Sequence, residues 1–347
     1  MQPDGRELAG MTTLPTCLIA CVILFGMILS PSARAETQEL RLGSGFGIHY
    51  LPFYVLEHES LIEKHAKLAG LPGLKATYSR ISGGGALNTA ILSGSVDIVG
   101  AGIGPFAIIW DKSFSNLRVK ALSGSGDIPL VLLTNDPRIH SLGDIRDGDR
   151  IALPAVKASM QATLLQMAVA NLKGDTHYSD LDQNTVTLPH SDALAAMVSH
   201  TGIVNLHFSV APYSTRELRD PAIHQILDSP GIVGGPSSIN LTFATTKFHD
   251  ANPMTCQVFL AALAEAMQII KADPALAARI YMESDKAAGA DAATIEKILR
   301  DPAFDFTINP HGVGKIVGFM HETGVIQHNP GNWRNLFFDE ATGLDGN

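Results

Sequence analysis

Cysteine is scarce in this sequence, with three residues among 347. Cys17 and Cys21 lie in an apolar segment near the N-terminus, and Cys256 is the third. If that segment is removed, no intramolecular disulfide can form. Stability in an oxidising compartment must then come from the burial of apolar side chains.

Positive charge is also in short supply. The chain has 25 lysines and arginines against 34 aspartates and glutamates, which gives a formal net charge of −9 at pH 7. Nucleic-acid binding requires a basic surface that neutralises phosphates, so we expect no nucleic-acid partner. The net charge does not exclude an anionic small ligand, because a recessed site creates its own local field.

No hydrophobic run approaches the roughly 20 residues that cross a bilayer. A 12-residue run, 18–29, is followed by Pro31 and by Ala33-Arg34-Ala35, which matches a secretory signal with an Ala-x-Ala cleavage site. We therefore expect residues 1–35 to be a cleaved signal peptide. The apolar run continues past the lipoprotein-like Cys21, which disfavours a lipid anchor.

Several motifs of enzymes and cofactor-binding proteins are missing. In the dinucleotide fingerprint a third glycine is required, and Ile48 or Pro105 stands at that position in the two nearest matches. Gly314-Lys315 is followed by Ile316, so there is no Walker A sequence, and no Gly-x-Ser-x-Gly elbow occurs. The 13 histidines show no convincing metal-ligand spacing. We expect no cofactor and no metal.

Short apolar or β-branched runs alternate with segments of helical period, which predicts an α/β fold with largely parallel sheets. The expected strands are 40–43, 74–81, 98–101, 119–123, 130–134, 150–153, 185–188, 203–208 and 241–246. The expected helices include 52–69, 86–93, 159–171 and 191–199, followed by 253–271, 274–284, 290–300 and 313–323.

A chain of this length normally forms more than one hydrophobic core, so we expect two lobes. No flexible linker is visible, and we expect the chain to cross between lobes within strands, near 133–136 and 241–246. The first lobe then comprises 36–134 and the mainly helical 243–347, and the second lobe, 135–242, is inserted between them. Two crossing strands form a hinge, and ligands bind in the cleft that such a hinge closes.

Glycine-rich loops follow four of the expected strands in the first lobe, at 43–47, 82–86, 100–105 and 123–126. In open α/β sheets, such loops at the carboxyl ends of strands line the ligand crevice. Glycine lets backbone N–H groups approach a ligand, and a helix N-terminus adds partial positive charge, which suits anionic oxygens. The alternative is that each glycine only permits a tight turn.

The candidate ligand-binding residues come from these loops and from the matching strand ends of the second lobe. In the first lobe they are Ser44, Gly45, Phe46, His49, Tyr50, Gly84, Gly85, Gly102, Ile103 and Ser123. In the second lobe they are Lys157, Ser159, Met160, His190, Asn205 and His207. Ser159 is expected to cap a helix, with Lys157 beside its positive end. Each histidine can hydrogen-bond a ligand or, when protonated, pair with an anion.

Several segments carry a family resemblance: 51–55, 83–88, 92–98, 141–145, 324–326 and 333–337. Together they resemble the nitrate, sulfonate and taurine family of ABC-transporter solute-binding proteins, including relatives that bind thiamine-precursor pyrimidines. The resemblance implies a type II periplasmic binding protein fold, with two lobes that each have a mainly parallel sheet flanked by helices. It also implies a periplasmic monomer that delivers its ligand to a membrane permease and its ATPase.

We expect a binding protein, not an enzyme, that closes on a small organic anion such as a sulfonate or carboxylate. A neutral heterocycle such as a pyrimidine is the alternative, because Phe46, Tyr50 and Phe106 are able to stack on it. An exported enzyme using the same cleft, with His49 or His207 as general base, is a further alternative. A sensory role is not distinguished from transport. The family often has an Asp-Ala pair where 204–206 stands, so this chain lacks one negative charge there.

Overall fold

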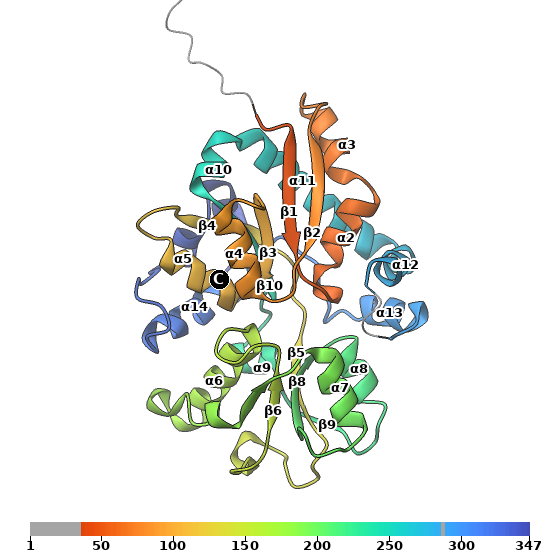
Figure 1. Ribbon diagram of the computed structural model, residues 1–347, viewed down its shortest axis with the longest axis vertical. Coiled ribbons are helices and arrows are strands. Elements are labelled where there is room, and N and C mark those ends of the chain that lie inside the picture. The colour runs from red at the N-terminus through yellow and green to blue at the C-terminus, as the bar shows by residue number, and fades with distance from the viewer. Residues whose placement is uncertain (1–35, 286–288) are drawn as a thin grey trace, which may run out of the picture. The chain divides into compact units, whose positions relative to one another are not determined.

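The computed structural model describes residues 36–285 and 289–347, and the expected signal peptide lies outside them. The described residues form two five-stranded sheets flanked by helices, which confirms the α/β fold class (Figure 1). The first sheet has the order β2-β1-β3-β10-β4, from β1 (Glu39–Ser44), β2 (Lys75–Arg80), β3 (Ile98–Gly102), β4 (Val119–Gly124) and β10 (Asn240–Thr245). The second has the order β7-β6-β8-β5-β9, from β5 (Leu130–Thr134), β6 (Ile151–Leu153), β7 (Thr185–Thr187), β8 (Leu206–Val210) and β9 (His224–Asp228).

Each sheet is mainly parallel and contains one strand of opposite direction. β10 runs antiparallel to β3 and β4, and β5 runs antiparallel to β8 and β9. The chain enters both of these strands from the other sheet, so each begins at the edge where its parallel neighbours end. The carboxyl ends of the parallel strands of both sheets therefore lie on the side where the chain crosses, which is where ligands bind in α/β sheets.

The crossing points differ from those predicted. Residues 130–134 were assigned to the first lobe, but β5 pairs with β8 and β9 of the second sheet. The passages are 125–129 and 234–239, each before a strand and not within it. A connection as short as 125–129 also fits a hairpin within one sheet, so its length alone does not reveal a crossing. We propose lobe boundaries at these passages: 36–124 with 240–347, and 130–233.

The helices around the first sheet come from both parts of the first lobe (Figure 1). They are α2 (Leu51–His58), α3 (Leu61–Leu68), α4 (Gly84–Ser93), α5 (Ile103–Lys112), α10 (Thr246–Ala251), α11 (Pro253–Ala272), α12 (Pro274–Ser284), α13 (Ala292–Leu299) and α14 (Val313–Glu322). Those of the second lobe are α6 (Met160–Lys173), α7 (His190–Val198), α8 (Tyr213–Glu217) and α9 (Ser229–Val233). Short 3₁₀ turns include η1 (Ile48–Tyr50).

The helix α11 is the central helix of the first lobe. It is the one helix within 36–285 and 289–347 that is long and apolar enough to cross a membrane by length and composition. Its buried residues recur three or four positions apart, as at Phe259, Leu263 and Met267, so one face packs inward. It packs against α2 and α3, and the Phe53 and Phe259 ring centroids lie 6.2 Å apart. This burial accounts for its apolar composition.

A cluster of three side chains joins the two passages between the sheets. The Ser238 hydroxyl donates to Asp127 Oδ1 at 3.1 Å, and His311 Nδ1 lies 2.5 Å from Asp127 Oδ2. Asp127 and Ser238 belong to opposite passages, which also form an isolated antiparallel bridge. Burial raises the pKa of Asp127, and the contact with His311 partly offsets this. We refer to Asp127, Ser238 and His311 as the hinge cluster.

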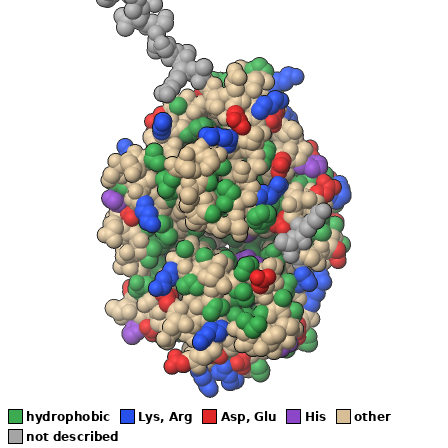
Figure 2. Space-filling model, in the orientation of Figure 1, with side chains coloured by type: hydrophobic (Ala, Val, Ile, Leu, Met, Phe, Trp, Pro, Cys, Tyr) green, Lys and Arg blue, Asp and Glu red, His purple; other side chains and the backbone are tan. Residues whose placement is uncertain are grey.

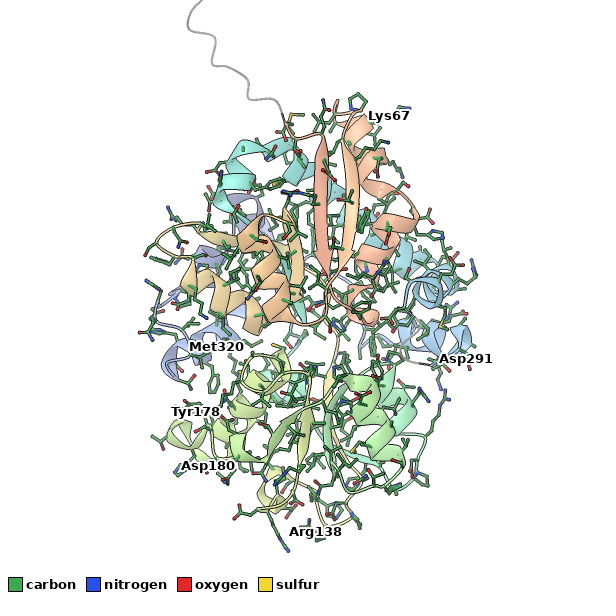
Figure 3. The ribbon with its side chains drawn as sticks, in the orientation of Figure 1. Lys67, Arg138, Tyr178, Asp180, Asp291 and Met320 are labelled. Carbon is green, nitrogen blue, oxygen red and sulfur yellow. The ribbon has the colours of Figure 1, made fainter. Side chains whose placement is uncertain are left out.

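The two lobes also touch away from the hinge. The Tyr178 hydroxyl of the second lobe donates to Thr323 O at 3.3 Å, and Lys315 Nζ of the first lobe donates to Val233 O at 2.6 Å. Figure 3 shows Tyr178 and, on α14, Met320 near this boundary. These bonds connect α14 to the second lobe.

Candidate ligand-binding site

The loop after β1 is held tightly in place. A Cβ atom on Gly45 would lie 2.6 Å from the Tyr50 ring, so only glycine fits there unless the ring moves. The Tyr54 hydroxyl donates to Gly45 O at 3.2 Å. Ser44 and Tyr50 are buried, whereas Phe46 is 47% exposed at the loop surface. The backbone of this loop is thus fixed beside the end of β1.

The same loop is linked to a carboxylate that follows α12. Gly47 has φ of 110° and donates its N–H to Asp285 Oδ2 at 2.6 Å. Burial, followed by the charge of Asp285, raises the pKa of Tyr213 in the second lobe to about 12. A buried carboxylate of the first lobe therefore lies near an aromatic side chain of the second.

His49 follows this loop in η1. Its Nδ1 is buried and has no hydrogen-bond partner within the described part of the chain. Its ring centroid lies 4.4 Å from that of Tyr50. Burial lowers the pKa of His49 to about 4, so the imidazole is neutral at pH 7. A buried, unpartnered ring nitrogen is costly, and a ligand is able to satisfy it.

The glycines at the starts of α4 and α5 have different environments. A Cβ on Gly84 would clash with the Pro105 ring, so this glycine allows two loops to pack together. Gly85 has open space where its Cβ would stand. Gly102 precedes α5, whose first residue, Ile103, is fully buried.

The starts of α5 and α6 meet across the lobe boundary. A Cβ on Gly102 would lie 3.6 Å from Met160 Cβ, and one on Gly104 would lie 3.2 Å from Thr163 Oγ1. Two helix N-termini thus converge, each with backbone N–H groups that carry partial positive charge.

The loop before α6 behaves partly as predicted. Ser159 caps the helix, because its Oγ accepts from Ala162 N at 3.2 Å, and the same hydroxyl donates to Ala155 O at 2.7 Å. Its hydroxyl is therefore used within the protein. Lys157 is exposed and has φ of 61°, so it lies in the turn before the helix.

Three side chains of the second lobe form a hydrogen-bonded chain. His190 Nδ1 lies 2.8 Å from His207 Nε2, and His207 Nδ1 lies 2.6 Å from Glu217 Oε1. His207 and Glu217 are fully buried, whereas His190, the first residue of α7, is partly exposed. The His190 ring stacks on Tyr213 with centroids 5.4 Å apart. We refer to Glu217, His207 and His190 as the histidine relay.

The relay reaches the lobe boundary at His190. The pKa of His190 lies well below its usual value, mainly because of burial and then because of His207 and His49. The effect of His49 means that a histidine of the first lobe and one of the second lie close together. Both imidazoles are neutral at pH 7.

Two predicted residues are engaged elsewhere. Asn205 precedes β8, at the amino end of that strand, where its Oδ1 accepts from Arg150 N at 2.7 Å and its Nδ2 donates to Asp149 Oδ1 at 2.8 Å. The ladder places it at the sheet edge opposite the carboxyl ends, so assigning it to the cleft was wrong. The strand was expected at 203–208, which includes Asn205. In the structure it spans Leu206–Val210, so Asn205 lies just before its amino end. The Ser123 hydroxyl is fully buried and pairs with Thr242 Oγ1 at 2.8 Å between neighbouring strands.

The structure thus brings together the loop after β1, the start of α5, the start of α6 and His190. Glu217, Tyr213 and Asp285 were not among the predicted site residues. Tyr213 and Glu217 are four residues apart on α8, a spacing that puts both on one helix face. The face drawn in Figure 2 is hollowed between the two halves, with hydrophobic and histidine side chains inside.

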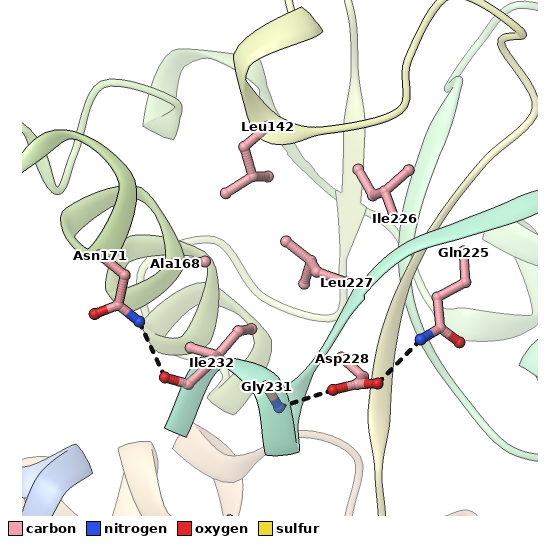
Figure 4. A pocket seen from close by; sticks show the side chains of 9 residues that line it. All are labelled: Leu142, Ala168, Asn171, Gln225, Ile226, Leu227, Asp228, Gly231 and Ile232. Carbon is pink, nitrogen blue, oxygen red and sulfur yellow. Dashed lines mark hydrogen bonds between the residues drawn. The ribbon is translucent and has the colours of Figure 1, made fainter. Parts of the chain in front are cut away.

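Two cavities lie outside this group of residues. One, of about 440 Å³, is in the second lobe near Leu142, Asn171 and Leu227 (Figure 4). The other, of about 270 Å³, lies between α6 and α14, and Lys315 and Glu322 are among its lining residues. Neither includes a predicted site residue, and the residues at the starts of α5 and α6 are packed together.

No protein-family model matches the chain, and no curated protein sequence matches it. Solved structures, in contrast, match the chain in fold. The alkanesulfonate-binding protein SsuA from Xanthomonas axonopodis pv. citri, bound to MOPS, has a TM-score of 0.67 at 19% identity, over 85% of this chain and 96% of that one. The periplasmic aliphatic sulphonate-binding protein SsuA from Escherichia coli has a TM-score of 0.66 at 19% identity, over 88% and 100%. The periplasmic nitrate-binding protein NrtA from Synechocystis PCC 6803 has a TM-score of 0.59 at 12% identity, over 76% and 70%. The chain has the fold of periplasmic binding proteins.

Proposed function

We propose that this protein is the extracytoplasmic solute-binding subunit of an ABC importer. Its lobes close on a small organic anion, a sulfonate or a carboxylate, and deliver it to a membrane permease and its ATPase. The proposal includes export through residues 1–35 and action in the periplasm as a monomer without catalysis. The shared fold with sulfonate- and nitrate-binding proteins supports this assignment.

The observation that carries the proposal is the convergence of unsatisfied or donor-rich polar groups from both lobes at the crossing side of the two sheets. The N-termini of α5 and α6 meet there, and His49 brings a buried Nδ1 without a partner in the described residues. A ligand with anionic oxygens would satisfy such N–H donors.

A neutral N–H-bearing heterocycle is the second candidate. Its support is the neutral state of the two imidazoles, because burial lowers the pKa of His49 to about 4 and that of His190 well below its usual value. An unprotonated ring nitrogen accepts a hydrogen bond, and Tyr50 and Tyr213 offer faces for stacking.

The test is a thermal-shift screen of the purified protein against alkanesulfonates, benzenesulfonate, benzoate and 4-aminopyrimidine. We expect a sulfonate or carboxylate to raise the melting temperature in a concentration-dependent way and to be recovered chemically unchanged. A shift with 4-aminopyrimidine alone would favour the second candidate. Chemical conversion of a bound compound, or no shift with any small solute, would contradict the proposal.

The variant Lys157→Ala tests the anionic nature of the ligand. Lys157 is exposed beside the start of α6, so its loss should weaken anion binding by about two- to tenfold without lowering the melting temperature of the free protein. Lys297→Ala, on the distant α13, is the matched control. Equal affinity in Lys157→Ala and in the unchanged protein would show that Lys157 does not contribute to ligand binding.

A further inference from the structure

We infer that Glu217 fixes the direction of the histidine relay, so that an anion binds at His190 only together with one proton. The inference rests on the proposed function and names the condition under which the same site accepts an anion. It concerns a positioning residue, Glu217, because this carboxylate acts on the ligand through His207 and His190.

The direction follows from which groups donate. An ionised carboxylate only accepts hydrogen bonds, so the 2.6 Å contact requires His207 Nδ1 to carry the proton. When His207 is neutral, its Nε2 is an acceptor, and His190 Nδ1 donates to it across the 2.8 Å contact. A neutral His190 therefore has a bare Nε2, which is a hydrogen-bond acceptor and repels an anionic oxygen.

A second contact agrees with this direction. The amide Nε2 of Gln161, in the first turn of α6, lies 3.3 Å from His190 Nε2. An amide N–H donates, so its partner is an unprotonated nitrogen. All hydrogen bonds from Gln161 through His190 and His207 then point toward Glu217.

The surroundings of His190 keep it neutral in the free protein. It is the first residue of α7, where the partial positive charge of the helix N-terminus disfavours a cation. Burial lowers its pKa well below the usual value, and His207 and His49 lower it further. The other charged or titratable groups near His190 are Glu217 and Tyr213 on α8, Asp192 on α7 itself, and Arg216 and Asp285, whose charges act on Tyr213.

A bound anion favours the protonated form of His190. A proton taken from solvent forms an N–H bond at His190 Nε2, which then donates to the anionic oxygen. The hydrogen bond from the Gln161 amide to this nitrogen is lost in exchange. Free His190 is protonated only below its lowered pKa. Above that pH, the dissociation constant for an anion should rise tenfold for each pH unit. A neutral ligand with its own N–H group takes the place of the Gln161 amide as donor to this nitrogen and needs no proton.

The experiment counts protons directly. Benzenesulfonate, benzoate and 4-aminopyrimidine are each added to the purified protein in unbuffered sodium chloride at about pH 7, in a pH-stat, and affinities are measured by calorimetry across the pH range. We expect about one proton taken up per bound anion and none per 4-aminopyrimidine. Anion binding without proton uptake, or an affinity that does not change with pH, would overturn the inference and leave the proposed function intact. Binding of 4-aminopyrimidine alone overturns both the inference and the choice of anion. Binding of none of the three overturns the proposed function as well.

The variant Glu217→Gln provides the structural test. A glutamine amide is able to donate to His207 Nδ1, which reverses every hydrogen bond in the relay. The neutral His190 then carries its one ring proton on Nε2 and not on Nδ1. Anion binding should then proceed with no proton uptake and lose its pH dependence. Glu283→Gln, whose side chain is 71% exposed, is the matched control and should keep the uptake of one proton. Continued uptake of one proton by Glu217→Gln would contradict the inference. If that variant does not fold, the proton count on the unchanged protein decides.

Discussion

At the scale of single residues, the glycines around the candidate site do different things. Gly45 leaves room for the Tyr50 ring, and Gly47 adopts φ of 110°, which other residues rarely do. Gly85 faces open space. From sequence these positions look alike, because each follows an expected strand.

This difference can be measured by two alanine substitutions. Gly45→Ala should lower the free energy of unfolding by about 1–3 kcal/mol, since the new Cβ would lie 2.6 Å from a buried ring. Gly85→Ala, within α4, should leave stability unchanged or raise it by up to about 1 kcal/mol. Urea unfolding of both variants measures the two values. Equal effects at the two positions would show that the Tyr50 ring moves aside freely.

Residue identity predicted part of the site. His190 and His207 were recognisable as polar residues near strand ends, and the structure joins them through a 2.8 Å contact. Glu217 was missed because the contact depends on how α8 packs on β8, which has no short-range signal. Asn205 was misplaced for a related reason, since hydrophobic pattern locates a strand better than it locates its ends.

At the scale of elements, most strands and long helices were predictable. Residues 130–134 match β5 as expected, because they form a short continuous apolar run, and 274–284 match α12, because their apolar residues recur at helical spacing. The loop at 100–105 was expected to open a helix, which is α5, but no bounds were predicted for it, since its sequence from Ile103 contains glycine and proline in the first turn and is apolar on most faces. The strand β9 is polar and half-buried, so it has no strong strand pattern.

The hinge cluster should contribute to stability in a pH-dependent way. His311→Ala leaves the buried carboxylate of Asp127 with only the Ser238 hydroxyl, and should cost about 1–3 kcal/mol at pH 7. The pKa of Asp127 is already raised by burial, so the folded state binds a proton more readily than the unfolded chain. The free energy of unfolding therefore falls as the pH rises through the range in which Asp127 loses its proton. The loss of stability caused by His311→Ala should then become smaller toward pH 4.

The double variant Asp127→Asn with His311→Ala is the control for this pH dependence. It removes the carboxylate, so the extra loss at neutral pH should disappear. Thermal unfolding of both variants between about pH 4 and pH 8 measures it. A loss in His311→Ala that stays constant across this range would show that Asp127 is not the group responsible.

At the scale of the whole molecule, ligand affinity should depend on contacts that no ligand touches. The Tyr178 hydroxyl bonds Thr323 O across the lobe boundary, so Tyr178→Phe favours separation of the lobes. One hydrogen bond contributes about 0.5–1.5 kcal/mol, which predicts binding weaker by about two- to tenfold. Ser199→Ala removes a hydroxyl that bonds within the second lobe and is the matched control. The affinity of each variant for the ligand found by thermal shift is measured by calorimetry. Identical affinities in Tyr178→Phe and Ser199→Ala would show that the bond between Tyr178 and Thr323 does not hold the lobes together.

The central claim is that two lobes, joined by the passages 125–129 and 234–239, close on a small solute. Small-angle X-ray scattering of the purified protein, with and without a saturating amount of the solute that raises its melting temperature most, tests this most directly. The account predicts a smaller radius of gyration when the solute is bound, as the lobes come together. An unchanged radius of gyration at full occupancy would contradict it.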